Sequence, residues 1–131
     1  MKQIKFASST GKVRIEWDFD GDYLVRTTAK LMGFSGHSEG HVVKDVFEQF
    51  AEDVAALNKI RKGEARLESA HPGEFELIVR SVDGAGHLGV FGKLNFTSTQ
   101  NRKEIQKLEF ALEFPPEQIE SAAKALNEVA P

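Results

Sequence analysis

The feature that most constrains the fold is a repeated alternation of apolar and polar residues, broken by turns too short to contain a helix. One face of the clearest such segment consists of Val13, Ile15, Trp17 and Phe19. Charged residues lie between them, which is the pattern of a strand buried on one face. Asp20-Gly21 then gives a strong hairpin signal, and the chain returns through residues 23–32. This part of the sequence predicts two antiparallel strands.

The same alternation recurs along most of the chain. The other predicted strands are residues 2–6, 64–69, 74–82, 87–97 and 105–114. The stretches that separate them are rich in turn residues, as in His71-Pro72-Gly73 and Asp83-Gly84. Parallel neighbours need a crossover of about a dozen residues, so turns this short predict antiparallel pairing.

Two segments depart from this period and are predicted helices. In residues 42–60 the apolar positions recur at helical spacing, as Val43, Val46, Phe47, Phe50, Val54 and Leu57. Pro115-Pro116 is suited to the first turn of a second helix, over about residues 116–129. We therefore predict one α+β domain over residues 1–131, with about seven antiparallel strands in a curved sheet or two packed halves. The long central helix would cover an apolar face of the sheet.

Composition and charge exclude several classes of protein. The 131 residues include no cysteine, which excludes disulfides and thiolate metal sites and favours a reducing, cytoplasmic compartment. No apolar run approaches the roughly 20 residues of a membrane span, and the N-terminal segment does not resemble a signal peptide. The net charge of −3, without a basic cluster, argues against nucleic-acid binding. It is more consistent with a protein that stays soluble alone or meets a basic partner.

The segment GHSEG, residues 36–40, has the G-x-S-x-G spacing of the nucleophile elbow in serine hydrolases. A predicted strand precedes it and a predicted helix follows, as the elbow requires. The predicted hairpins conflict with the parallel sheet of such enzymes, however, and the histidines further along the chain, His71 and His87, fall at turns. We interpret the segment as a glycine-rich connection, with Ser38 or Gly40 near the helix N-cap. A hydrolase that uses Ser38 remains a remote alternative.

Two further motifs fail on their context. Residues 84–89 match the G-x-G-x-x-G of dinucleotide sites, but they are predicted to open a strand where such a site needs a helix. Asp18, Asp20 and Asp22 resemble the start of an EF-hand loop. The glycine and the glutamate that this loop requires are replaced by Tyr23 and Ala29.

A histidine pair has one element of metal-site spacing. His37 and His41 lie four residues apart, which would direct both at one metal ion on a helix, but glycines surround them. We predict no catalytic residue, no cofactor and no metal site, while adventitious zinc binding by His37 and His41 stays open.

Asp45, Glu48 and Glu52 recur at i, i+3 and i+7 on the long predicted helix, roughly opposite its apolar face. We expect an exposed, negatively charged stripe. Its ordinary interpretation is a solvated helix face. Its functional interpretation is a docking surface for a basic partner, which makes these three residues the candidate partner-binding residues.

Four segments resemble, in order, the WapI-like bacterial immunity proteins and their uncharacterised relatives. They are VFEQFAE at 46–52, GEARLES at 63–69, GHLGVFGKL at 86–94 and LEFALEF at 108–114. The match extends over roughly residues 12–130 and consists mainly of core and turn patterns. The resemblance implies a partner in a toxin of the cell-wall-associated WapA type, and a non-catalytic protein that neutralises this toxin by occluding its active cleft. If the toxin is a nuclease, its cleft is expected to be basic.

The sequence leaves two other possibilities open. A curved antiparallel sheet beneath a helix can hold an apolar ligand, so a small-ligand-binding or accessory domain is the main alternative. An exposed edge strand would also allow a homodimer, although nothing in the sequence requires one.

Overall fold

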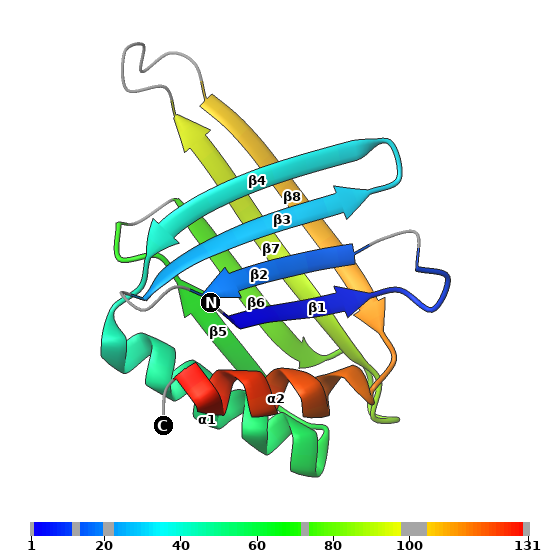
Figure 1. Cartoon of the computed structure of the whole chain (residues 1–131). Helices are drawn as coiled ribbons and strands as arrows, with labels where there is room; N and C mark the ends of the chain where they lie inside the picture. The colour runs from blue at the N-terminus through cyan, green and yellow to red at the C-terminus, as the bar shows by residue number, and fades with distance from the viewer. Residues whose placement is uncertain (1, 12–13, 20–22, 72–73, 98–104, 130–131) are drawn as a thin grey trace.

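The computed structural model describes residues 2–11, 14–19, 23–71, 74–97 and 105–129. Along the chain, four strands and a helix are followed by four more strands and a second helix (Figure 1). Each group of four strands forms its own antiparallel sheet. The predicted α+β class, with two packed halves, a long central helix and a C-terminal helix, is confirmed.

The N-terminal sheet is a meander in which each strand pairs with the next along the chain. Its strands are β1 (Lys2–Ala7), β2 (Arg14–Phe19), β3 (Leu24–Leu31) and β4 (Phe34–His41). Their alternation directs Ile15, Trp17 and Phe19 into the interior, where all three are buried. The strand that the alternating pattern predicts here is therefore confirmed.

The C-terminal sheet repeats the meander. Its strands are β5 (Glu64–Glu68), β6 (Phe75–Ser81), β7 (Leu88–Thr97) and β8 (Ile105–Phe114). The β7–β8 ladder is the longest, and it continues from Leu88↔Phe114 to Thr97↔Ile105. All four strands lie where the sequence predicted them.

β4 is the element that the sequence prediction missed. Residues 36–40, interpreted above as a connection, form part of this strand, which pairs with β3 along its whole length. The N-cap of the following helix is Val43, without a side-chain capping bond, so the placement of Ser38 or Gly40 near the N-cap was also wrong. The strand count is consequently eight.

Gly36, one of the two glycines in β4, has a packing reason. A Cβ atom placed on Gly36 would lie 2.5 Å from Cδ2 of Leu108 in the opposite sheet. A larger residue would force this Leu108 methyl group to shift, so glycine suits the close approach of the two sheets. The segment therefore alternates small inward residues with polar outward ones, instead of apolar with polar.

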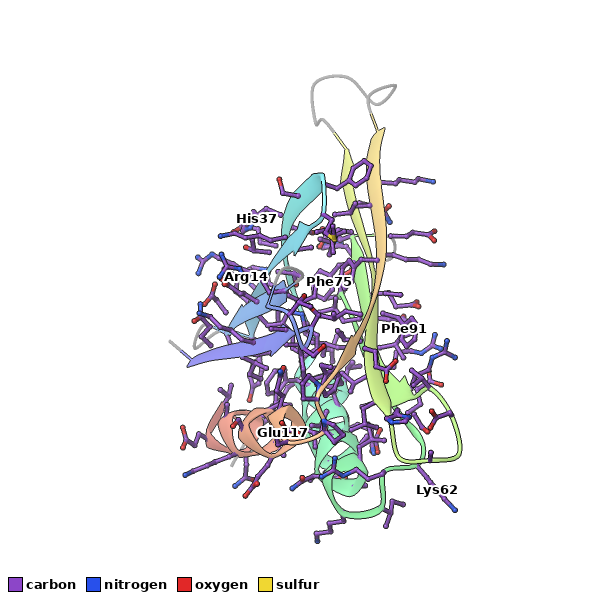
Figure 2. The ribbon with its side chains drawn as sticks, turned by 90° about the vertical axis from the view of Figure 1, so that its right-hand side faces the viewer. Arg14, His37, Lys62, Phe75, Phe91 and Glu117 are labelled. Carbon is purple, nitrogen blue, oxygen red and sulfur yellow. The ribbon has the colours of Figure 1, made fainter. Side chains whose placement is uncertain are left out.

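The two sheets face each other with their strands crossing, and the helices lie together at one end (Figure 1). In Figure 2, Phe75 lies between the sheets, while Arg14 and His37 project from the outer face of the N-terminal sheet and Phe91 from that of the C-terminal sheet. The interior is filled by buried aromatic and aliphatic side chains. Rings from both halves meet there, as Phe6 and Phe114 do at a centroid distance of 4.5 Å.

The two helices, α1 (Lys44–Ile60) and α2 (Gln118–Val129), each bury one apolar face. The ring of Phe50 in α1 packs against the ring of Trp17, with a centroid distance of 5.7 Å, and the ring of Phe47 packs against that of Phe19 at a centroid distance of 5.3 Å. These ring contacts hold α1 against the N-terminal sheet, so its outer face has a defined position. Neither described helix is long and apolar enough to cross a membrane.

Candidate functional site

The candidate stripe lies on the outer face of α1. The helix buries Phe47, Phe50, Val54 and Leu57 on one side. Asp45, Glu48 and Glu52 point to the opposite side, because residues three and seven apart share one helix face. Asp45 and Glu52 are exposed, and 45% of the Glu48 side chain is accessible to solvent. All three carboxylates can therefore reach a partner.

The local contacts of the stripe are weak ones. Glu48 forms an ion pair with Lys44 at 3.8 Å, one helical turn away. Such an exposed pair contributes only about 0–1 kcal/mol, so a partner could replace it at small cost. Asp45 lies in the first helical turn, where a negative charge also complements the helix dipole. One of the three carboxylates thus has a structural role besides any role in binding.

Two exposed apolar residues lie near the N-terminal end of α1 but outside the stripe. Val43 is 51% exposed and Val46 is 39% exposed. Val43 precedes the helix, and Val46 lies about 100° around the helix axis from Asp45 and about 160° from Glu48. We therefore call the surface formed by Asp45, Glu48 and Glu52 the α1 patch.

Ser38 does not have the setting of a nucleophile elbow. It lies in the middle of β4, opposite Thr27 of β3, and only 7% of its surface is exposed. An elbow requires a sharp turn between a strand and a helix, with the serine exposed at its apex. Here the backbone is extended and belongs to an antiparallel sheet, so the motif's spacing is a consequence of strand packing.

His37 and His41 cannot share a metal ion. Four residues along a strand span about 13 Å, well beyond the separation of two ligands of one zinc ion. His37 instead forms a hydrogen bond through Nδ1 with Oγ1 of Thr28, at 3.1 Å. Within the described part of the chain, no group of three or more histidine or acidic side chains is placed to hold a metal.

The remaining sequence motifs have structural explanations. Residues 84–87 lie in the β6–β7 turn and residues 88–89 begin β7, so the G-x-G-x-x-G pattern opens a strand as predicted. Asp18 lies on β2 and accepts a hydrogen bond from Nε2 of Gln3 at 3.0 Å. Asp20 and Asp22 lie outside the described residues.

Sequence reasoning missed an acid–imidazole pair at the β6–β7 turn. The Asp83 carboxylate lies 2.5 Å from Nδ1 of His87 and also accepts a hydrogen bond from the amide of Ala85 at 2.7 Å. The bond to Asp83, together with its charge, raises the pKa of His87 above the ordinary 6.5. The same bond holds the pKa of Asp83 below 3.8. The spacing Asp-x-x-x-His across a predicted turn was the available signal.

His87 of this pair borders an open surface hollow of about 420 Å³. Two other hollows have volumes of about 370 Å³, on the outer face of the C-terminal sheet, and about 270 Å³, beside β4. Ser8, Ser9 and Glu113 are among the residues that line the hollow beside His87. An acid-oriented imidazole beside hydroxyl groups can accept or donate a proton, but the side chains of Asp83 and His87 are 42% and 52% exposed. Water therefore competes for every polar group of the pair.

Comparison of the chain with protein-family models, with curated proteins and with solved structures finds no match.

Proposed function

We propose that this chain is a small non-catalytic binding protein of the immunity type, which neutralises a cognate bacterial toxin by covering its active cleft. The observation that carries the proposal is the α1 patch, where three carboxylates share the outer surface of one helix. The resemblance to WapI-like proteins supports the same function. The complementary partner surface is basic, as expected for the cleft of a nuclease.

The packing of α1 suits this role. Phe47 and Phe50 anchor the helix to rings of the N-terminal sheet, so the patch is held in place before binding. A pre-organised surface loses little conformational entropy when the complex forms. Its negative charge would attract a basic cleft at a distance and increase the rate of encounter.

The test is charge reversal of the stripe in the variant Asp45→Lys, Glu48→Lys, Glu52→Lys. The binding partner tested is the protein encoded in the reading frame directly upstream of that of this chain, and association is followed by surface plasmon resonance at low salt. We expect the association rate constant to fall by at least about tenfold, because electrostatic steering typically contributes this much or more. The matched control reverses Glu68, Glu109 and Glu113, which are exposed carboxylates of the C-terminal sheet.

Both variants undergo the same change in net charge, so a general charge effect would slow them equally. An equal effect, or an unchanged rate in the stripe variant, would contradict the role of the α1 patch. A neighbouring toxin domain that does not bind the wild-type protein would contradict the immunity function itself.

A second candidate function, small-ligand binding, has one supporting observation. The hollow on the outer face of the C-terminal sheet lies within the roughly 300–1,000 Å³ range of ligand pockets. Ile78 and Phe91 give it an apolar centre, and Glu76, Lys93 and Glu109 surround them. Native mass spectrometry of the purified protein would show a retained small molecule if this function is correct, and the bare chain mass if it is not.

A further inference from the structure

The free edge of β4 carries backbone groups that point away from the N-terminal sheet. β3 and β4 are joined by the two-residue turn Met32-Gly33, and Leu31 and Phe34 are the closing pair. Antiparallel pairs alternate between those that exchange hydrogen bonds and those that do not. Counting from the closing pair, the amides and carbonyls of Ser35, His37, Glu39 and His41 face the open edge.

One hydrogen bond at the end of β4 agrees with this alternation. The amide of Ala70 donates to the carbonyl of His41 at 2.7 Å, so the last outward carbonyl of β4 already accepts a bond from another segment. Among the described residues, none donates to or accepts from the outward backbone groups of Ser35, His37 and Glu39. A row of three residues is therefore available at this edge.

β4 lacks the usual protection of an edge strand. Natural edges are blocked by lysine, by proline or by a β-bulge. The sequence of β4, FSGHSEGH, contains neither lysine nor proline, and its register with β3 is continuous. The other edge strands are more heavily charged, as in β5 with Glu64, Arg66 and Glu68.

The C-terminal sheet provides a platform beside this edge. In Figure 1, β4 is the outermost strand of its sheet, and β7 and β8 extend beyond it behind its free side. A hollow of about 270 Å³ lies there, and its lining includes Phe34 and Gly36 of β4 and Leu94 and Leu108 of the platform. Phe34 is 69% exposed, so the hollow is bordered by a large apolar side chain without cover.

We propose that the β4 edge binds an extended peptide segment of a partner protein, which adds to the N-terminal sheet as a further strand. Its backbone would pair with Ser35, His37 and Glu39. Alternate side chains of an added strand point to the same face, so a large apolar residue at an inward position would enter the hollow against Leu94 and Leu108. Main-chain pairing would supply affinity and the hollow would supply specificity.

The size of the hollow and the sequence of β4 select this occupant. A volume of about 270 Å³ is smaller than the roughly 300–1,000 Å³ of typical small-molecule pockets, but it suits individual apolar side chains. A second copy of the chain fits poorly. Antiparallel self-pairing centred on His37 would place Ser38 and Gly40 of the second copy at the hollow, and neither would fill it. The proposal does not rest on the α1 patch, because Phe34 begins β4 at the end remote from α1 (Figure 1).

The test compares His37→Pro with His37→Ala. Proline removes the outward N–H of residue 37 and places its ring at the edge, while β3 pairing does not use that N–H. Alanine removes the same imidazole and keeps the N–H. The probes are dodecapeptides selected from a random phage-displayed library on the wild-type protein, and their binding is measured by fluorescence anisotropy.

We expect the selected peptides to share alternating apolar residues. They should bind His37→Ala within about twofold of the wild type and His37→Pro at least about tenfold more weakly, because the backbone bond is lost and the edge is obstructed. Equal binding to the two variants, or selection without an alternating pattern, would overturn the proposal. A wild-type dimer that His37→Pro converts to a monomer would also overturn it, in favour of a second copy as the occupant.

A second measurement keeps the test valid if His37→Pro does not fold. Amide hydrogen exchange of Ser35, His37 and Glu39 is followed by NMR in the wild-type protein, with and without a selected peptide. Slower exchange at all three amides supports strand addition. Unchanged exchange with the peptide bound excludes it.

Discussion

Asp83 and His87 show how a hairpin turn can bring two titratable side chains together. The raised pKa of His87 means that its charged form is favoured in the folded protein. The resulting stabilisation is fully present below pH 6.5 and is lost as the pH rises through the raised value. For Asp83, whose pKa is lowered, stabilisation is present above pH 3.8 and is lost as the pH falls through the lowered value. The pair therefore stabilises the turn most between these two ordinary values.

Asp83→Asn tests this account of the turn. Asparagine keeps an oxygen that can accept from the amide of Ala85 but removes the charge beside His87. We expect the titration midpoint of the His87 ring, followed by NMR of its carbon-bound protons, to move down towards 6.5. Of the remaining causes, burial lowers the pKa of His87 by more than the charge of Glu113 raises it, so no upward shift should remain in the variant. An identical midpoint in both proteins would show that Asp83 does not hold the proton on the ring.

At the scale of the element, the β7–β8 ladder depends on one close approach between a glycine and a ring. Gly92 pairs with Phe110, and a Cβ atom on Gly92 would overlap that ring. Gly92→Ala should displace the buried Phe110 side chain and lower the free energy of unfolding by about 1–3 kcal/mol, as overpacking does. Gly84→Ala is the matched control, because open space surrounds this position. Urea unfolding measures both, and equal midpoints would mean that Phe110 can move aside without loss.

Most elements could be predicted from the sequence because their burial follows a clear period. α1 has apolar residues at helical spacing, and the other strands alternate apolar with polar residues. β4 was missed because its inward positions are Gly36, Ser38 and Gly40, so the strand has no apolar period to detect. Gly36 and Gly40 are small because the opposite sheet lies close to them. The residues that neighbour them along the chain do not reveal such a contact between sheets.

The candidate surfaces also differ in whether the sequence alone could predict them. The stripe of Asp45, Glu48 and Glu52 was predictable, since helical spacing alone places the three residues on one face. The β4 edge was not, because it depends on a strand that the sequence did not indicate and on a hollow shared with β7 and β8. The Asp83–His87 pair required the geometry of the turn as well as its spacing. A surface built within one helix is visible in sequence, whereas one built between sheets is not.

At the scale of the whole molecule, two meanders that are each followed by a helix share one interior. The aromatic pair Phe6–Phe114 crosses between the halves and joins β1 to β8. A sheet exposed on both faces cannot stabilise itself in water, so each meander depends on the other for its buried face. The two halves should therefore unfold together, even though their backbone hydrogen bonds are confined to separate sheets.

The single tryptophan makes this cooperativity measurable. Trp17 is fully buried in the N-terminal half, with its ring against Phe6 and Phe50. In urea, the transition followed by Trp17 fluorescence should coincide with the far-UV circular dichroism transition, which reports both sheets and both helices. Separate midpoints would show that one sheet keeps its structure after the other sheet has unfolded.

Cutting the chain after Lys62, between α1 and β5, tests the same shared interior with two fragments. Each fragment should be unfolded alone. An equimolar mixture should regain the fluorescence of buried Trp17 only if the shared interior is what stabilises both sheets.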